Sequence, residues 1–329
     1  MAVTVCGETA MSHCCLIGGG GFIGAHVANA LLLQGQRITI LDTRTAPAYL
    51  AQTVNYVVGD YGHKETLRSV LVGVDTVINL SYASVPSTSI EDPIQDILSN
   101  LPAAVGLFEV ASEYPIRKIV MISSGGTVYG SAEGVPLTED HATNPISPYG
   151  VTKLAIEKYG HMFYRIKELP VVIVRPANAY GEGQNPFVGQ GFIGTAIAAV
   201  LSRREIILYG SRGTIRDYVH VEDVASGIVA VLASGQPGAI YNIGSGEGRS
   251  NKDVLDEIRP HAESLGLAFR IATLPARRFD VEKNVLDSTK LQADTGWTIR
   301  IPFREGVQRT WDWFVANRNL WMGLKDAKR

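Results

Sequence analysis

The sequence has few cysteines, no long apolar run and no excess of charge. Its cysteines, Cys6, Cys14 and Cys15, crowd the N-terminus without the spacing of a zinc site or a disulfide framework. This favours a reducing cytoplasmic environment. No apolar run approaches the roughly 20 residues that span a bilayer, and Met1–Ala10 lacks the regions of a signal peptide. We therefore expect neither membrane insertion nor export.

Charge and histidine placement exclude further classes. The 30 Lys and Arg residues nearly balance the 32 Asp and Glu residues, so no basic surface for nucleic acid or anionic lipid is expected. The seven histidines show no metal-ligand spacing, and no metal site is predicted. With 46% hydrophobic residues over 329 positions, the chain has enough material for a nucleotide-binding sheet with a smaller appended lobe. Met11 is an alternative start, and the ten residues before it are left out of the fold prediction.

Short β-branched runs alternate with longer helical patterns in the first half of the chain. Continuous apolar runs are typical of parallel strands covered by helices on both faces. We predict a doubly wound α/β sheet with strands at 14–17, 37–41, 55–58, 76–80, 118–122 and 171–174. After Arg175 this rhythm breaks, leaving a helix near 191–201, a strand-like run at 206–209, and a run at 239–243 that fits either lobe. We expect a larger domain over 12–175, which also receives segments after 215, and an interleaved smaller α/β lobe over 176–329.

Three glycines mark the turn after the first predicted strand. Gly18, Gly21 and Gly24 lie directly before the helical stretch 25–33. Their G-x-x-G-x-x-G spacing permits a tight turn, close approach of the backbone to a pyrophosphate, and close helix packing. A glycine pattern alone also fits a flexible turn, but the preceding strand and following helix favour dinucleotide binding.

The acidic residues at two later strand ends bear on the choice of cofactor. Asp42 lies where a carboxylate would hold a ribose 2′-hydroxyl and repel a 2′-phosphate. This favours NAD over NADP, although Arg44 nearby could receive such a phosphate. Asp60 is a candidate for the adenine side, and taken alone it fits an ordinary turn.

Tyr149 and Lys153 lie four residues apart in a helix that Pro148 is suited to begin. A phenol with a pKa near ~10 needs a nearby positive charge to act as a base at neutral pH. Lys153 and the positive nicotinamide ring of the cofactor would provide it. Alone the pair fits an exposed helix surface, but together with the glycine turn it indicates a catalytic pair.

Several ordered motifs resemble those of the extended short-chain dehydrogenase/reductases. Within them the chain is most similar to the nucleotide-sugar epimerases typified by UDP-glucose 4-epimerase, from about Cys14 to near Trp313. The resemblance implies a Rossmann domain with NAD, a lobe for a UDP-sugar, and a homodimer formed by helices at 96–113 and 149–166, the first of which Pro102 would start or kink. The motifs are Gly18–Gly24 with Phe22 and Ile23, Ser123-Ser124 before Val128-Tyr129-Gly130, Tyr149 with Lys153, Arg175–Asn178, and Arg216–Asp223.

The resemblance also implies a reaction without net oxidation. Tyr149 would deprotonate the sugar 4-hydroxyl as hydride leaves C4 for NAD, and the resulting 4-keto sugar would turn over before hydride returns to its other face. Lys153 would hold the nicotinamide ribose and lower the tyrosine pKa. The cofactor contacts implied are Gly18, Gly21, Phe22, Ile23, Gly24, Asp42, Asp60, Tyr61, Leu80, Ser123, Tyr149 and Lys153.

One position departs from the family pattern. Gly125 stands where relatives carry a catalytic Ser or Thr, so Ser124 or Thr127 would have to replace it. We prefer Thr127, because strand alternation points it the same way as position 125. Sugar 4,6-dehydratases carry Asp-Glu where this chain has Gly126 and Thr127, and decarboxylating relatives carry Glu at the latter. The resemblance therefore disfavours both reactions and leaves epimerisation or 4-keto reduction.

The substrate contacts come from the second half. Arg216 and Arg277 match positions that bind the pyrophosphate, for which paired guanidinium donors are suited. Asn178 matches a sugar or phosphate contact, and Tyr209 lies where relatives hold the base. Asn284, four residues after Asp280, occupies a position where tyrosine favours plain hexoses. We therefore expect UDP-GlcNAc and UDP-GalNAc to be accepted alongside, or instead of, UDP-glucose and UDP-galactose.

Two other functions stay open. An NAD(P)H-dependent 4-keto-sugar reductase would use the same tyrosine and lysine but consume a reduced cofactor. A non-catalytic dinucleotide sensor would keep the fold without turnover, and Gly125 is the feature in its favour.

Overall fold

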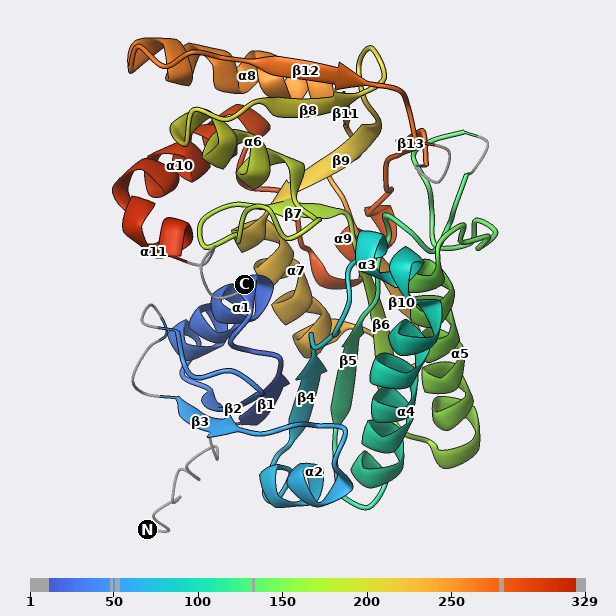
Figure 1. Ribbon diagram of the computed structural model, residues 1–329. Coiled ribbons are helices and arrows are strands. Elements are labelled where there is room, and N and C mark those ends of the chain that lie inside the picture. The colour runs from blue at the N-terminus through green and yellow to red at the C-terminus, as the bar shows by residue number, and fades with distance from the viewer. Residues whose placement is uncertain (1–11, 48–49, 51–53, 132–133, 278–280, 324–329) are drawn as a thin grey trace, which may run out of the picture.

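A computed structural model describes residues 12–47, 50, 54–131, 134–277 and 281–323 (Figure 1). Its largest sheet has seven parallel strands in the order β10-β6-β5-β4-β1-β2-β3. The strands are β1 (His13–Ile17), β2 (Arg37–Asp42), β3 (Asn55–Val58), β4 (Thr76–Asn79), β5 (Lys118–Ile122), β6 (Val171–Pro176) and β10 (Ile240–Ile243). The doubly wound fold class is confirmed.

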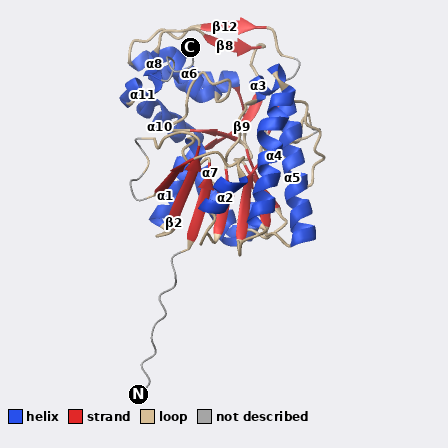
Figure 2. Cartoon of the chain, turned by 60° about the horizontal axis from the view of Figure 1, so that its bottom comes forward, coloured by secondary structure: helices blue, strands red, loops and turns tan. Residues whose placement is uncertain are grey.

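Helices cover both faces of this sheet (Figures 1 and 2). One face carries α1 (Phe22–Leu33), α7 (Val221–Ser234) and α9 (Thr289–Thr295); the other carries α2 (Lys64–Val70), α4 (Pro93–Ala111) and α5 (Pro148–Lys167), with the short α3 (Pro86–Glu91) beside them. Pro102 lies inside α4. The expectation that it would start this helix is wrong, because Pro93 already occupies the first turn, where a missing N–H is harmless.

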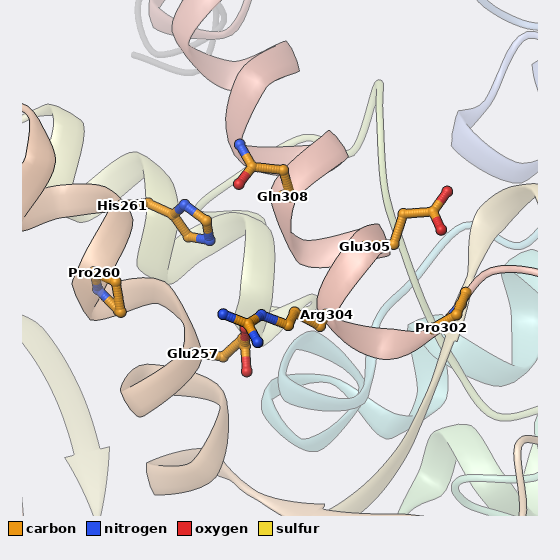
Figure 3. Close-up of a pocket in the computed structure, with 7 residues that line it drawn as sticks. All are labelled: Glu257, Pro260, His261, Pro302, Arg304, Glu305 and Gln308. Carbon is orange, nitrogen blue, oxygen red and sulfur yellow. The ribbon is translucent and has the colours of Figure 1, made fainter.

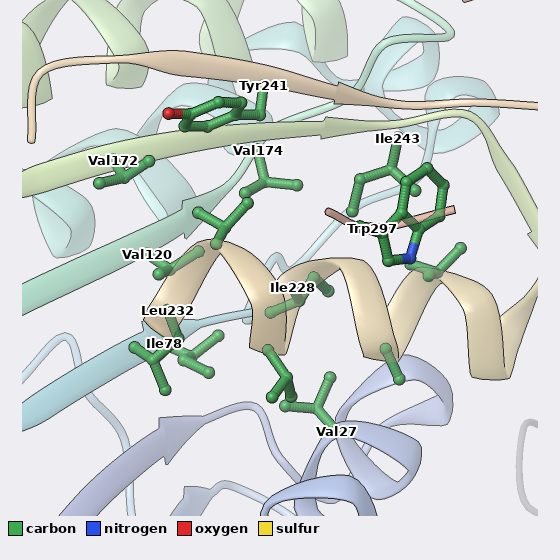
Figure 4. Close-up of a cluster of buried hydrophobic side chains, with 14 of the residues drawn as sticks. Val27, Ile78, Val120, Val172, Val174, Ile228, Leu232, Tyr241, Ile243 and Trp297 are labelled. Atoms are coloured by element: carbon green, nitrogen blue, oxygen red, sulfur yellow. The ribbon is translucent and has the colours of Figure 1, made fainter. Parts of the chain in front are cut away.

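Alternating side chains explain the two-sided burial. Leu16 packs toward α1 and α7, while the next residue, Ile17, packs toward α2 and α4. Figure 4 shows the first of these cores, where Val120 and Val172 of the sheet approach Ile228 of α7. A strand buried on both faces needs apolar residues at every position, which is why these segments read as continuous apolar runs.

The strand order reverses between β1 and β4, which lie side by side. In doubly wound sheets the carboxyl ends of such a strand pair form the crevice that binds ligands. The backbone at this edge is fixed by hydrogen bonds from the Gly18 N–H to the Leu41 carbonyl and from the Leu80 N–H to the Ile17 carbonyl, both 2.8 Å long.

The smaller part of the molecule lies beyond the carboxyl ends of the sheet (Figure 1). One sheet contains β7 (Asn178–Tyr180), β9 (Ile215–His220), β11 (Gly248–Ser250) and β13 (Lys283–Asn284), and a second pairs β8 (Ile206–Tyr209) with β12 (Ile271–Leu274). They share a core with α6 (Phe192–Leu201), α8 (Asn251–Ser264), α10 (Phe303–Ala316) and α11 (Arg318–Gly323). The run at 239–243, left open above, supplies β10, which pairs with β6 in the larger sheet.

Candidate active site

The glycine turn lies at the crevice and is closely packed. Gly18 has φ +76°, and a Cβ added to it would lie 2.8 Å from the Ser81 amide nitrogen. A Cβ on Gly24 would lie 2.6 Å from the Gly19 Cα. Gly21 is the N-cap residue of α1 and makes no side-chain cap. The N-terminus of α1 is therefore capped by a residue without a side chain, as close approach of a phosphate requires. The Arg44 side chain lies beside it, since Nη2 would be 3.5 Å from a Cβ added to Gly21.

Asp42 ends β2 directly beside this turn. Its buried carboxylate accepts hydrogen bonds from the Gly20 N–H at 3.1 Å and from the Arg44 N–H at 3.0 Å. The Arg44 side chain also pairs with it, with 3.1 Å between Nε and Oδ1. Asp60 instead accepts the Gly62 N–H at 2.8 Å and forms an ordinary Asx turn.

Four other residues were predicted as cofactor contacts. Phe22 and Ile23 form the first turn of α1, and Leu80 follows β4, where its carbonyl carbon would lie 3.2 Å from a Cβ added to Gly18. Tyr61 is buried, and this burial raises the pKa of its phenol to about 12 although a hydrogen bond with Asn79 lowers it.

Tyr149 and Lys153 lie in the first two turns of α5 and are both buried. The helix begins at Pro148, and the Ser147 side chain caps it by accepting the Gly150 N–H at 3.2 Å. Lys153 Nζ donates to the Ile122 carbonyl at 2.9 Å. This contact ties the helix to the carboxyl end of β5 and points the amine toward the crevice edge of the sheet.

Burial disfavours the charged forms that catalysis would use, the Tyr149 phenolate and the Lys153 ammonium. It raises the pKa of Tyr149, as does the Asp96 carboxylate, while a hydrogen bond with Ser124 lowers it. Burial lowers the pKa of Lys153 to about 7, against the attraction of Glu157 and Asp96. A low-dielectric site disfavours the charged form of each group, so a further positive charge is needed to produce a phenolate.

Ser124, and not Thr127, lies beside the Tyr149 hydroxyl. Residues 125–127 form a turn, so the strand alternation used to prefer Thr127 does not apply, and that expectation lacks its physical basis. Thr127 Oγ1 is buried and has no hydrogen-bond partner among the described residues. A Cβ on Gly125 would overlap Leu286 Cδ1 and lie 3.0 Å from the Arg175 carbonyl. Leu286 therefore fills the place of the missing side chain.

The Ser123 hydroxyl is used inside the protein. It donates to Glu157 of α5, which forms a buried ion pair with Arg175, 2.6 Å between Nη2 and Oε2. Arg175 also donates to the Tyr129 hydroxyl at 2.9 Å. This network fixes the segment 123–129 against α5 and β6, and it leaves only the backbone of Ser123 for the cofactor contact expected of this residue.

Two substrate-side residues lie against the same turn. Asn178 Nδ2 would lie 3.9 Å from a Cβ added to Gly126 and donates to the Asp217 carbonyl at 3.2 Å. Asn284 is fully buried and donates to the Gly125 carbonyl at 3.0 Å, while its Oδ1 has no partner among the described residues.

The cationic candidates lie on neighbouring elements of the smaller part. Arg216 is in β9, where it pairs in register with Asn284 of β13. The Arg277 guanidinium lies 4.2 Å from the centre of the Tyr209 ring at the end of β8. Asp280, also predicted as a substrate contact, lies outside the described residues.

Three side chains near the catalytic pair were missed in the sequence. Tyr82 and Asp96 contact or face Tyr149 and Lys153, and Leu286 fills the space at Gly125. Of these three, only Asp96 could have been recognised in the sequence. It is a carboxylate within the amphipathic helix α4, and an acidic residue is seldom buried without a partner.

A separate groove of about 460 Å³ lies between α8 and α10. None of the predicted site residues lines it; Figure 3 shows its lining, which is Glu257, Pro260, His261, Pro302, Arg304, Glu305 and Gln308. The described residues hold no group of three His, Cys, Asp or Glu side chains that could bind a metal ion. No helix in the described part of the chain is long and apolar enough to cross a membrane.

A glycine turn at the switch point of a parallel sheet, with a buried Tyr149–Lys153 pair on one helix, defines a nicotinamide-dependent oxidoreductase site of the short-chain dehydrogenase/reductase type. The chain belongs to the NAD dependent epimerase/dehydratase family, whose model matches residues 14–244. The resemblance to this family and the expected NAD dependence are thereby confirmed.

Individual relatives include epimerases and dehydratases. The UDP-glucose 4-epimerase of Halalkalibacterium halodurans is 30% identical over 317 residues, covering 90% of this chain and 93% of its own. The solved complex of the Thermus thermophilus UDP-glucose 4-epimerase with NAD is 32% identical, with a TM-score of 0.86 over 93% of this chain and 99% of that one. DesIV, a dTDP-glucose 4,6-dehydratase from Streptomyces venezuelae with NAD and TYD bound, is 28% identical, with a TM-score of 0.86 over 95% and 99%.

Proposed function

We propose that this chain is an NAD-dependent epimerase that inverts C4 of a UDP-hexose through a transient 4-keto sugar. The observation that carries the proposal is the buried Tyr149 phenol, hydrogen-bonded to Ser124 and one helical turn from Lys153. The 4-epimerases among the relatives support the same reaction.

The residues of the crevice fit NAD. The close-packed turn at Gly18 and Gly24 leaves no room for side chains, and the N-terminus of α1 would offer its backbone N–H groups to a phosphate. Asp42 would accept a hydrogen bond from a ribose hydroxyl, and its negative charge would repel a 2′-phosphate. The Arg44 guanidinium, which could otherwise receive such a phosphate, is paired with the Asp42 carboxylate. We assign this role to a domain comprising residues 12–175 with α7 and β10, and sugar binding to the interleaved remainder of 176–329.

In the proposed reaction, Tyr149 takes the proton of the sugar 4-hydroxyl and later returns it, while Ser124 donates to the reacting oxygen. Bound NAD supplies the hydride acceptor and, while oxidised, a positive charge. Because burial raises the pKa of Tyr149, that charge and a protonated Lys153 favour the phenolate. Lys153, fixed on the Ile122 carbonyl, also holds the ribose.

Dehydration is disfavoured because Gly126 and Thr127 cannot supply the acid and base that dehydratases of this family carry at these positions. A Cβ on Gly126 would meet nothing closer than Asn178 Nδ2 at 3.9 Å. This open space beside Ser124 suits a bulky sugar ring better than a pair of acidic side chains.

At the substrate end, Arg216 and Arg277 would bind the diphosphate and Tyr209 the base, with Asn178 near the sugar. We further propose that Asn284 leaves room for a 2-acetamido group, because its side chain is turned onto the Gly125 carbonyl. UDP-GlcNAc and UDP-GalNAc should then interconvert, and Asn284→Tyr should remove that activity while sparing UDP-glucose and UDP-galactose. Wild-type protein inert toward the acetylated sugars but active on the plain hexoses would refute this specificity.

We also propose a homodimer formed by α4 and α5. Both helices expose apolar side chains on the surface away from the sheet, an unusual concentration for a monomer. A hollow of about 410 Å³, lined in part by Ile97 and Val151, lies where the helices meet. Light scattering should give twice the chain mass, and Ile97→Glu with Val151→Glu should halve it. The exposed residues are Ile94, Ile97, Leu98, Val151, Tyr159, Met162 and Ile166.

A cytoplasmic location completes the proposal. Cys14 and Cys15 are free thiols in the described part of the chain, and a chain without a disulfide framework is typical of a reducing compartment. Cell fractionation with a periplasmic or secreted marker tests it.

The decisive experiment is incubation of purified protein with UDP-, dTDP- and GDP-sugars and no added cofactor, followed by proton NMR. An epimerase should carry bound NAD and convert one UDP-hexose into its C4 epimer. A requirement for stoichiometric NADH or NADPH would favour a 4-keto reductase instead, and nucleotide binding without any turnover would favour a sensor. Tyr149→Phe should abolish turnover and leave the fold intact.

A further inference from the structure

Asp96 of α4 is buried, with 2% of its surface exposed, close to the catalytic pair. No lysine or arginine in the described part of the chain forms an ion pair with it. Three hydroxyl groups donate to it instead: Thr152 Oγ1 to Oδ2 at 2.6 Å, Tyr82 Oη to Oδ1 at 3.2 Å, and Ser84 Oγ to Oδ1. A buried acceptor with three converging donors is held in one position.

The Tyr82 ring connects Asp96 to the catalytic pair. Its centre lies 4.0 Å from Lys153 Nζ, within the range of a cation–π contact, and 4.7 Å from the centre of the Tyr149 ring, which it meets edge to face. Thr152, a second of the three Asp96 donors, lies between Tyr149 and Lys153 in the sequence of α5. Two of the Asp96 contacts thus come from residues next to the pair: Tyr82, whose ring contacts both members, and Thr152, which precedes Lys153 in the same helix.

We propose that Asp96 is a positioning residue for the reaction proposed above: through Tyr82 and Thr152 it fixes the Tyr149 phenol and the Lys153 amine relative to each other, and its charge acts on both. The inference rests on the proposed function, because it assigns Asp96 a part in that same site. Asp96 contacts neither reacting atom and is not itself a catalytic residue.

The charge of Asp96 acts on the two groups in the same direction. It raises the pKa of Tyr149 and of Lys153, together with that of Tyr82. The other charged group acting on Lys153 is Glu157, one turn further along α5. Removing the Asp96 charge should therefore lower the pKa of the phenol and of the amine together.

The test is the pH dependence of kcat for Asp96→Asn. If the acid limb reports ionisation of Tyr149 and the alkaline limb loss of the Lys153 proton, both limbs should move to lower pH. Above about pH 8 kcat should fall about tenfold with KM little changed. Asp92→Asn is the matched control, because it removes the same charge one turn away at an exposed position beside α4. It should leave the profile unchanged.

A second variant separates the positioning effect of the Asp96 hydrogen bonds from the effect of its charge. Tyr82→Phe keeps the ring and the carboxylate but removes one contact between them. It should lower kcat without moving either limb, and it decides the matter if Asp96→Asn does not fold.

NMR of ¹³C-labelled lysine, with the Lys153 signal assigned by Lys153→Met, should show a lower titration midpoint in Asp96→Asn than in wild type. Size-exclusion chromatography checks that the oligomeric state is unchanged.

Two failures can be told apart. If wild-type protein and Asp92→Asn turn over no sugar, the proposed function has failed. If both are active while Asp96→Asn keeps the wild-type profile and Lys153 midpoint, or Tyr82→Phe keeps wild-type kcat, only the role of Asp96 is refuted.

Discussion

Gly125 and Leu286 share one space at the edge of the catalytic turn. A side chain at residue 125 would overlap Leu286 Cδ1 and crowd the Arg175 carbonyl, which belongs to β6 and has little freedom to move. We expect Gly125→Ser, which restores the residue type of the family, to lower the free energy of unfolding by about 1–3 kcal/mol.

Urea denaturation of Gly125→Ser, Leu286→Ala and the double variant provides the measurement. If the two positions compete for space, the double variant should lose less than the sum of the single losses. Strictly additive losses in the free energy of unfolding would mean that residues 125 and 286 do not compete for the same space.

The choice between the two candidate hydroxyls can be decided at single residues. Ser124 is hydrogen-bonded to Tyr149, whereas Thr127 Oγ1 has no partner in the described part of the chain. We expect Ser124→Ala to lower kcat about a hundredfold, since a donor to the reacting oxygen is lost. Thr127→Val, the control, should stay within about threefold of wild type. A reversed order of these two effects would restore Thr127 as the replacement for the family hydroxyl.

Lys153 couples folding stability to pH. Its pKa is about 7 in the folded chain against an ordinary value of 10.5, so between these values the unfolded chain binds a proton that the folded chain does not. Stability therefore rises with pH across this window, and a constant penalty remains below it. In protein freed of nucleotide, Lys153→Met should be more stable than wild type near pH 6, by a few kcal/mol at most. The gain should shrink toward pH 10, as measured by thermal melting, and a gain independent of pH would contradict this account.

At the scale of elements, apolar pattern predicted most of the large sheet. The runs at 14–17, 37–41, 76–80 and 118–122 match β1, β2, β4 and β5 to within one residue, because strands buried on both faces must be apolar nearly throughout. The segment 123–127 could not be read this way. It is a turn whose shape depends on contacts with Leu286 and Asn284, more than 150 positions away in the chain.

The site residues also divide into those that a local pattern predicts and those that depend on contacts distant in the sequence. The glycines, Asp42, Tyr149 and Lys153 are local patterns and were predicted from spacing and resemblance. Asp96 escaped prediction because its donors come from the loop after β4 and from α5, which meet α4 only in the folded chain.

The buried Glu157–Arg175 pair joins α5 to β6, with 3% and 2% of the two side chains exposed. Arg175→Met would leave a buried carboxylate unpaired, so we expect a loss of about 3–5 kcal/mol in the free energy of unfolding. The double variant Glu157→Leu with Arg175→Met should lose less.

The exposed Lys64–Glu109 pair between α2 and α4 is the control, and Lys64→Met should cost about 1 kcal/mol or less. Equal losses in the free energy of unfolding for Arg175→Met and Lys64→Met would show that burial of the Glu157–Arg175 pair does not increase its contribution to stability.

At the scale of the whole molecule, the chain crosses between the two parts more than once. After β7 and β8 it returns through α7 and β10, which complete the large sheet and cover one of its faces. It then leaves again for β11 and α8. The turn at Gly125 is likewise closed by Asn284 of β13. A cut at Arg175 therefore separates segments that share one core.

This interleaving predicts the behaviour of a fragment. Residues 12–176 contain β1–β6 but lack β10, which pairs with β6, and α7, whose Ile228 and Leu232 pack on Val120, Val172 and Val174 (Figure 4). The fragment would expose an apolar sheet face and an open strand edge, both of which promote aggregation. We expect it to be insoluble or to unfold without a cooperative transition. Joining residues 215–245 to it by a flexible linker restores α7 and β10 and should recover solubility and a sharp melting transition. Cooperative melting of the shorter fragment would mean that α7 and β10 are dispensable for the first core.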